Sequence, residues 1–91
     1  MSAKLDEMWA ALEAYQPTAN ADGHGESWRV MCRERTTEAT RWAYYVADYY
    51  VAEGSAADAA WYAYSALFVA RHRSTDYHAQ RAIDAIKEVK P

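Results

Sequence analysis

The stretch that decides the fold is ATRWAYYVADYYVAEGSAADAAWYAYSALFVA, residues 39–70. Alanine recurs every three or four positions on both sides of Gly54, which places small side chains on one face of each of two helices. Gly54 suits the position that ends a helix, and Ser55 can cap the next one. Because the expected connection is about two residues, the helices should be antiparallel neighbours. The two rows are Ala39, Ala43 and Ala47, and Ala59, Ala63, Ala66 and Ala70.

We expect this antiparallel helical hairpin to comprise residues 27–53, capped by Ser27, and residues 55–73 or longer. Facing rows of alanine let the helix axes approach to the lower end of the usual range of about 8–10 Å. Two interpretations stay open for residues 74–76: they break the helix, or they lie inside one that continues to about residue 90. The C-terminal segment has its own apolar stripe, formed by Ala79, Ala82, Ile83, Ile86 and Val89.

The hairpin is preceded by a short N-terminal helix over residues 1–16 and a loop over residues 17–26. Pro17 ends the first helix, and two glycines mark the loop. The predicted architecture is therefore all-α, with residues 1–91 forming a single helical domain and residues 27–90 its helical hairpin. One face of the first helix carries large apolar side chains at helical spacing: Leu5, Met8, Trp9, Leu12 and Tyr15.

The composition excludes several alternatives. In 91 residues there are only 11 Leu, Ile, Val and Phe, against 20 Ala and 8 Tyr. This excludes a Val/Ile-rich parallel sheet and a leucine-zipper coiled coil. A net charge of −3 and a pI near 5.5 make general nucleic-acid binding an unfavourable interpretation.

The sequence predicts a cytoplasmic protein without a membrane segment. The single cysteine, Cys32, has no internal partner for a disulfide, and the N-terminus lacks the apolar run of a secretory signal. The most apolar stretch, residues 56–70, contains Asp58 and Ser65 and is shorter than the roughly 20 residues of a membrane span.

We find no pattern typical of catalysis. Asp22, His24 and Glu26 alternate in the loop, but their spacing matches no established zinc or calcium site. Cys32 lies on an apolar helix face, where a cysteine is usually a small core residue. No nucleophile with a base, carboxylate pair in a recognisable setting or phosphate loop is evident. We therefore predict a protein that is not an enzyme, with no catalytic residues, metal or cofactor.

The arginines are unevenly placed. All seven lie between residues 29 and 81. A continuous hairpin would place Arg29, Arg33 and Arg35 at the same end as Arg71, His72, Arg73, His78 and Arg81, opposite a tip containing Asp48, Glu53 and Asp58. Arginine binds phosphate and carboxylate through paired hydrogen bonds. Three interpretations stay open: a solvated face paired with nearby carboxylates, a surface for an acidic partner protein, or a site for a nucleotide-like ligand. The candidate ligand-binding residues are Arg29, Arg33, Arg71 and Arg73.

The aromatic residues exceed what one buried face can hold. Tyrosine pairs at residues 44–45 and 49–50 surround the first arm of the hairpin, and Trp61, Tyr62 and Tyr64 follow on the second. Tyrosine is favoured at interfaces because it combines apolar area with a polar tip. The alternatives are a surface for self-association or a partner protein, and an amphipathic rim around an alanine-rich core. The candidate partner-binding residues are Tyr45, Tyr49, Trp61 and Tyr62.

The segment GHGESWRVMCRERTTEA, residues 23–39, followed by the Ala-, Tyr- and Trp-rich helices, resembles small Ala-rich helical accessory proteins of tailed phages. The resemblance covers residues 23–70 and implies a host-interaction or anti-defence role, by binding a host protein or sequestering a signalling nucleotide. It implies no enzymatic activity. The residues that carry it are His24, Gly25, Glu26, Trp28, Met31, Cys32, Glu34, Arg35 and Thr36.

We therefore expect a non-enzymatic binding protein that forms a homo-oligomer and acts by covering the surface of a host or other partner protein. The alternative is the binding of a small phosphorylated ligand, such as a nucleotide, at the arginine-rich end of the hairpin.

Overall fold

A computed structural model describes residues 3–51, 54–69 and 74–89 of the chain. The described residues form helices and no strands, which confirms the predicted all-α class with its helical hairpin. The helices are α1 (Ala3–Ala14), α2 (Gln16–Ala21), α3 (Gly25–Glu34), α4 (Thr37–Tyr50), α5 (Ser55–Phe68) and α6 (Thr75–Lys87).

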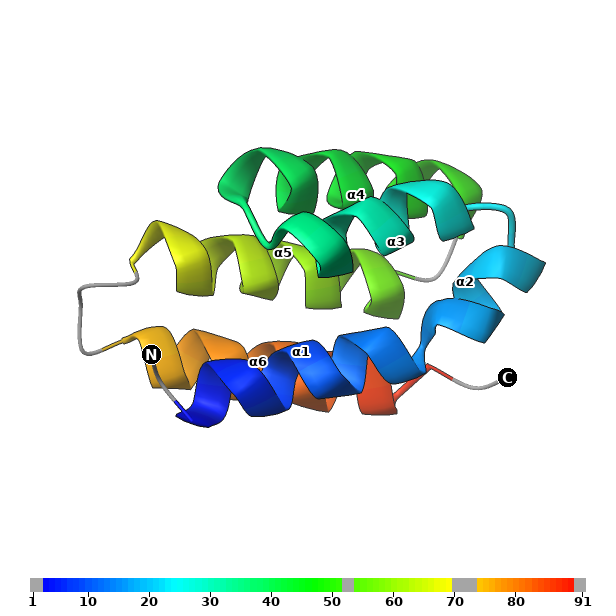
Figure 1. The fold of residues 1–91 in the computed structure, drawn as a ribbon. Coiled ribbons are helices and arrows are strands. Elements are labelled where there is room, and N and C mark those ends of the chain that lie inside the picture. Colours follow the sequence, from blue (N-terminus) through cyan, green and yellow to red (C-terminus); the bar gives the residue numbers. More distant parts are fainter. Residues whose placement is uncertain (1–2, 52–53, 70–73, 90–91) are drawn as a thin grey trace.

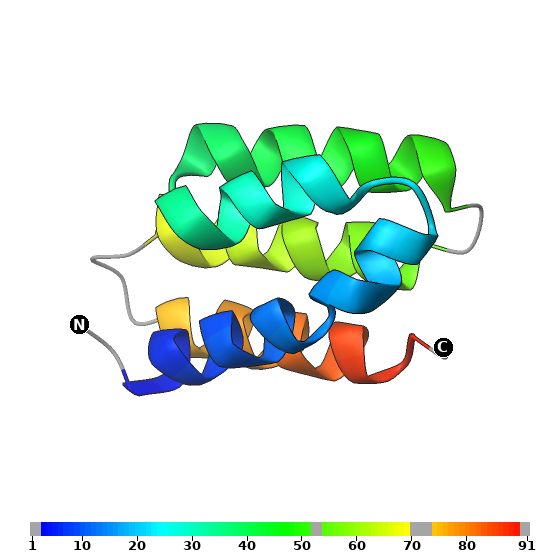
Figure 2. The same ribbon diagram turned by 45° about the vertical axis from the view of Figure 1, so that its right-hand side comes forward.

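The helices form two layers (Figures 1 and 2). In one layer α5 lies between α4 and α6 and packs against both. In the other, α3 packs against α4, and α1 packs against α6 and touches α3 and α5. The molecule measures 34 × 23 × 18 Å, with the main helices along its length. The opposite face of the α4–α5–α6 layer, which we name the outward face, is covered by none of the described helices.

The rows of alanine are buried as the sequence predicts. Ala43, Ala47, Ala59 and Ala63 have no exposed surface, and α4 and α5 pack against each other. Ala66 is buried as well, whereas Ala70 lies outside the described residues. Since α4 ends at Tyr50, residues 51–54 connect the two helices, and the connection is longer than the expected two residues.

The predicted continuous arm over residues 27–53 is wrong, because the chain turns back at Arg35 and Thr36. Arg35 adopts the left-handed conformation (φ 54°, ψ 44°), and its backbone N–H donates to the Met31 carbonyl. Thr36 is extended, and its Oγ1 accepts the backbone N–H of Ala39 at 3.1 Å, which caps α4. As a result α3 folds back along α4, and Gly23 approaches the ring of Tyr50.

The segment expected as a loop, residues 17–26, is partly helical. Pro17 lies in the first turn of α2, where its missing N–H costs no helical hydrogen bond. His24, and not Ser27, is the N-cap residue of α3, and the Ser27 hydroxyl donates to the His24 carbonyl at 3.1 Å. Gly25 allows α2 and α3 to pack closely, because a Cβ there would lie 2.9 Å from Asn20 Cα.

The question left open at residues 74–76 is answered by two separate helices. The last turn of α5 ends at Phe68, and α6 begins at Thr75 and packs back along α5. The Thr75 hydroxyl donates to the Val69 carbonyl at 2.6 Å, which ties the start of α6 to the end of α5. Residues 70–73 lie outside the described part of the chain.

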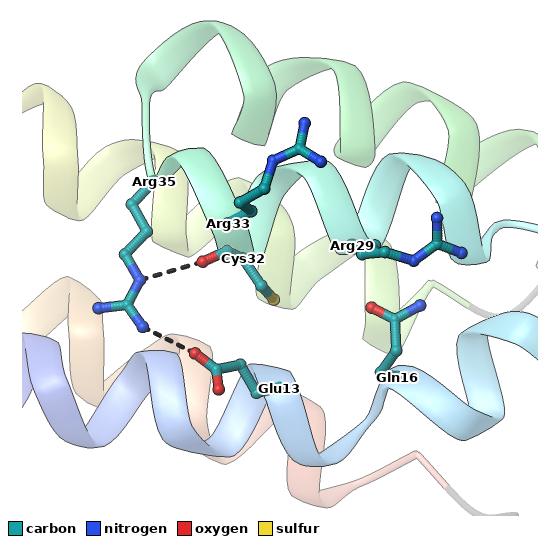
Figure 3. A pocket seen from close by; sticks show the side chains of 6 residues that line it. All are labelled: Glu13, Gln16, Arg29, Cys32, Arg33 and Arg35. Atoms are coloured by element: carbon teal, nitrogen blue, oxygen red, sulfur yellow. Dashed lines mark hydrogen bonds and ion pairs between the residues drawn. The ribbon is translucent and has the colours of Figure 1, made fainter.

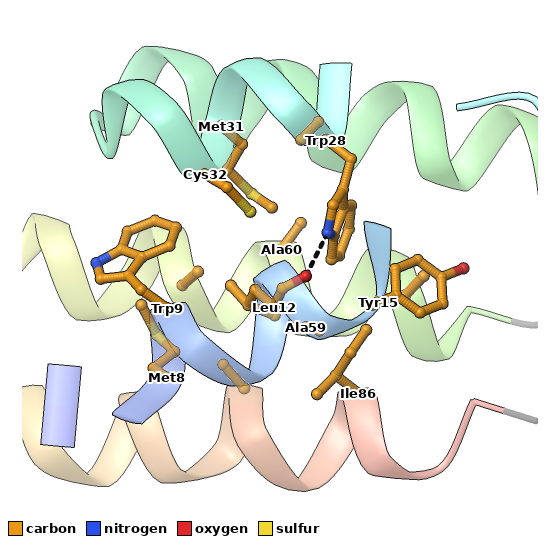
Figure 4. Packing of buried hydrophobic residues seen from close by; sticks show 14 of the residues in the cluster. Met8, Trp9, Leu12, Tyr15, Trp28, Met31, Cys32, Ala59, Ala60 and Ile86 are labelled. Carbon is orange, nitrogen blue, oxygen red and sulfur yellow. Dashed lines mark hydrogen bonds between the residues drawn. The ribbon is translucent and has the colours of Figure 1, made fainter. Parts of the chain in front are cut away.

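The core lies between the two layers (Figure 4). All five apolar residues predicted to share a face of the first helix are buried. Trp28 of α3 has no exposed surface, and its indole Nε1 donates to the Leu12 carbonyl at 2.8 Å. The ring of Tyr15 packs edge-on against Trp28 at 4.9 Å. Of the residues described, no helix combines the length and apolar character that crossing a membrane requires.

Candidate functional site

A continuous line of aromatic rings crosses from α4 to α5. Tyr45 packs on Tyr44, whose ring lies 5.3 Å from that of Trp61. The line continues along α5 through centroid distances of 5.5 and 5.9 Å. Tyr45, Trp61 and Phe68 are exposed, with Phe68 at 71%. We name this line the aromatic band; its residues are Tyr45, Tyr44, Trp61, Tyr64 and Phe68.

The four candidate partner-binding residues lie in different settings. Tyr45 and Trp61 belong to the aromatic band. Tyr49 is 83% exposed and packs on the ring of Tyr50 at 5.2 Å, outside the band. Tyr62 is only partly exposed and lies on the side of α5 that faces α6. The structure therefore joins two of the four into one surface and separates the other two from it.

Tyr62 is already in contact with Arg81 of α6. Its Nη2 donates to the Tyr62 hydroxyl at 3.1 Å, and its guanidinium lies 5.2 Å from the Tyr62 ring centre and 5.9 Å from that of Tyr77. The hydrogen bond that Arg81 donates to Tyr62 is the main reason that the pKa of Arg81 is raised. The rings of the outward face thus bind a cation within the chain itself.

Acidic residues gather beside this arginine. A hollow of about 250 Å³ lies between α5 and α6. The hollow is lined by Asp58, Tyr62, Arg81, Asp84, Ala85 and Glu88.

On α4, Arg41 and Asp48 flank the aromatic band, and neither forms an ion pair with another described residue.

A second depression, which we name the arginine groove, lies between α1 and α3 (Figure 3). Its volume is about 520 Å³, within the range of small-molecule sites. Arg35 bridges it, donating to Glu13 Oε1 at 2.7 Å and to the Cys32 carbonyl at 3.1 Å. The other residues lining it are Gln16, Arg29, Cys32 and Arg33.

The groove gathers only part of the predicted ligand-binding cluster. Arg29 and Arg33 line it together, whereas Arg71 and Arg73 lie outside the described residues. The expectation that the N-terminal arginines share one end of the hairpin with Arg81 is wrong. It assumed a continuous helix over residues 27–53, but α3 turns back, and Arg81 contacts Tyr62 on another face.

Two side chains of types that often take part in catalysis, Cys32 and His24, are buried in the core. Burial, together with a smaller effect of nearby Glu13, raises the pKa of the Cys32 thiol to about 12, and Arg35 opposes this shift. His24 is buried, its Nε2 lies 3.2 Å from the Tyr15 hydroxyl, and burial lowers its pKa although Asp22 opposes the shift. Burial and Asp22 together raise the pKa of Tyr15 to about 12.

The alternating side chains of Asp22, His24 and Glu26 do not converge on one site that could bind a metal ion. His24 points inward while Asp22 and Glu26 are exposed. Over residues 3–51, 54–69 and 74–89, no three His, Cys, Asp or Glu side chains are grouped as metal ligands.

Sequence reasoning missed Tyr44, Tyr64 and Phe68 as members of a single surface. The signal was present in their spacing. Trp61, Tyr64 and Phe68 recur at intervals of three and four on α5, so that they share one side of that helix. Tyr44 joins them because α4 and α5 pack through small alanines, which brings the flanking rings together.

Comparisons with protein-family models, curated proteins and solved structures found no match to this chain.

Proposed function

We propose that the chain is a non-enzymatic binding protein that self-associates and docks its outward face onto a protein surface. The observation that carries this proposal is the aromatic band, a contiguous set of rings left uncovered by the described helices. Contiguous exposed apolar patches mark interaction sites, and Tyr and Trp supply much of the binding energy at protein interfaces.

The placement of the reactive side chains supports a binding role. A catalytic cysteine requires an exposed thiol of lowered pKa, whereas Cys32 is buried and its pKa is raised. His24 points into the core beside Tyr15. Binding through a surface requires neither group.

We further propose that the partner is a host protein and that the chain is a phage-encoded host-interaction or anti-defence factor. This rests on the resemblance of residues 23–70 to accessory proteins of tailed phages. A protein that blocks a host protein needs only a stable fold and a surface that binds its target.

The experiment compares immobilised wild-type chain with Tyr45→Ala and Trp61→Ala in capture from bacterial lysate, together with native mass. Trp42→Ala is the matched control. Trp42 and Trp61 are 45% and 46% exposed, but Trp42 lies about 200° around α4 from Tyr44. We expect the two band variants, and not the control, to lose capture and self-association while keeping the helical circular-dichroism spectrum. A strict monomer that captures no protein contradicts the proposal.

The arginine groove favours a second candidate, the binding of a small phosphorylated ligand. Arg29 forms no ion pair with another described residue, and Arg33 lies one turn further along α3. A thermal-shift screen of nucleotides and cyclic nucleotides tests this, because a ligand at 100 times its Kd adds about 2.7 kcal/mol of stability. The shift should disappear in Arg29→Ala/Arg33→Ala, and no shift across the panel removes this candidate.

A further inference from the structure

We propose that the outward face docks onto a second copy of this chain, with equivalent helices antiparallel across a two-fold axis level with Trp61. This inference rests on the proposed function and assigns its self-association to the outward face, in a stated arrangement. In such an interface each residue meets the residue at the same distance on the other side of the axis. A face that carries opposite charges at equal distances from its centre is then complementary to itself.

The centre of the face is defined by two contacts. The ring of Tyr44 lies 5.3 Å from that of Trp61, which joins the middle of α4 to α5. Arg81 donates to the Tyr62 hydroxyl at 3.1 Å, which joins the middle of α6 to the next residue of α5. The midpoints of all three helices therefore lie at nearly one level, where the aromatic rings are densest.

The charges on α4 are symmetric about this level. Arg41 and Asp48 lie at equal distances before and after the midpoint between Tyr44 and Tyr45. Their separation of seven residues is about 10.5 Å and nearly two helical turns, so both lie on the same side of α4. An antiparallel second copy brings Arg41 opposite Asp48 of that copy, and Asp48 opposite its Arg41.

The same relationship holds on α6. Arg81 and Asp84 lie at equal distances on either side of the level between residues 82 and 83, one to two residues beyond the centre of α6, and Tyr77 and Glu88 lie at equal distances further out. The antiparallel arrangement places Arg81 opposite Asp84 of the second copy, and the Tyr77 hydroxyl opposite its Glu88.

A parallel arrangement lays α4 over α6 of the second copy. It would bring Arg41 towards Arg81, and Asp48 towards Asp84, so that like charges meet. The charge pattern therefore selects the antiparallel arrangement.

The face is large enough for a stable dimer. Three helices abreast, at about 8–10 Å between axes, account for the 23 Å dimension, and the helices run along the 34 Å dimension. A standard specific interface buries about 800 Å² on each partner, which a face of these dimensions supplies. The exposed ring of Trp61 lies on the central helix of this face, and the charged pairs lie on the two flanking helices, which resembles the apolar centre and polar rim of typical interfaces.

Sedimentation equilibrium of the purified full chain in about 0.15 M salt tests the inference, since this salt screens the repulsion between two chains of net charge −3. We expect a monomer–dimer equilibrium. Arg41→Asp and Asp48→Arg each place like charges opposite one another in both symmetry-related pairs of the dimer. Each substitution should therefore weaken dimerisation about tenfold. The double variant Arg41→Asp/Asp48→Arg should restore dimerisation, and mixing the two single variants should give heterodimers in preference to either homodimer. Arg29→Asp, which changes net charge equally on the other layer, should dimerise like the wild type.

Several results would overturn this inference. A wild type that stays monomeric, a dimer insensitive to both reversals, or equal weakening by Arg29→Asp each contradicts it. If the chain is monomeric but Trp61→Ala still abolishes capture of another protein, the inference and the proposed self-association fail, whereas the proposed docking onto a partner protein stands. If neither dimerisation nor capture responds to Trp61→Ala, the proposed function fails as well.

Discussion

The ring of Tyr44 on α4 lies 5.3 Å from the ring of Trp61 on α5, and this contact joins the two arms of the hairpin into one aromatic surface. The contact exists because alanines lie between the two helices and leave the large side chains at the flanks. The same packing that stabilises the hairpin therefore creates the surface that we propose as its binding site.

Replacing Ala63 with Leu should destabilise the fold. Ala63 has no exposed surface, so a larger side chain forces the packed helices apart. We expect a loss of about 1–3 kcal/mol in the free energy of unfolding, measured by urea denaturation. Ala10→Leu, at an exposed position of α1, should stay within about 0.5 kcal/mol of the wild type. Equal stability of the two variants would contradict close packing through alanine.

Replacing Trp28 with Phe should also lower stability. The change removes the hydrogen bond from the indole Nε1 to the Leu12 carbonyl and leaves space in a fully buried position. Together these effects should cost about 1–3 kcal/mol. Trp42→Phe, at a position 45% exposed, is the control and should change the urea midpoint little. A Trp28→Phe variant as stable as this control would show that the indole hydrogen bond is dispensable.

Arg35 allows a test of the turn between α3 and α4. Its φ of 54° is costly for a residue with a Cβ, whereas glycine adopts it freely. Arg35→Ala and Arg35→Gly lose the same contacts to Glu13, Trp9 and the Cys32 carbonyl. We therefore expect the glycine variant to be more stable than the alanine variant by about 1 kcal/mol in chemical denaturation. The reverse order would mean that Arg35 is not left-handed.

His24 should make the fold sensitive to acid. Burial lowers its folded-state pKa below the ordinary value of 6.5, so the unfolded chain binds a proton more readily. The neutral histidine thus stabilises the fold above about pH 6.5, and this contribution is lost as pH falls, by at most about 1.4 kcal/mol per pH unit. Unfolding of the wild type and His24→Gln between pH 7.5 and 5 measures the difference. If the free energy of unfolding falls equally with pH in both proteins, the proposed effect of His24 is excluded.

The sequence predicted the helical faces well because they depend on local spacing. The stripe from Leu5 to Tyr15 and the alanine rows around Gly54 are buried as expected. The turn at Arg35 could not be anticipated, since neither glycine nor proline marks it. Its conformation is held by tertiary contacts to Glu13 and Trp9. The expected position of Arg29 and Arg33 relative to Arg81 assumed a helix without this turn and was therefore wrong.

The candidate site was predicted in part. The exposure of Tyr45, Tyr49 and Trp61 follows from an excess of aromatic residues over one helix face. The binding of Tyr62 by Arg81 could not be predicted, because the sequence left open whether residues 74–90 turn back along α5. Once α6 packs there, Tyr62 gains a partner within the chain.

The most direct test of the docking surface follows the indole N–H signals of the four tryptophans in ¹H–¹⁵N spectra of the wild-type chain. Trp61 lies at the centre of the outward face, whereas Trp28 is buried with its N–H bonded to Leu12. Between about 10 μM and 1 mM protein, we expect the Trp61 signal to shift progressively and the Trp28 signal to stay fixed. A Trp61 signal that does not change with concentration would contradict docking of a second copy on this face.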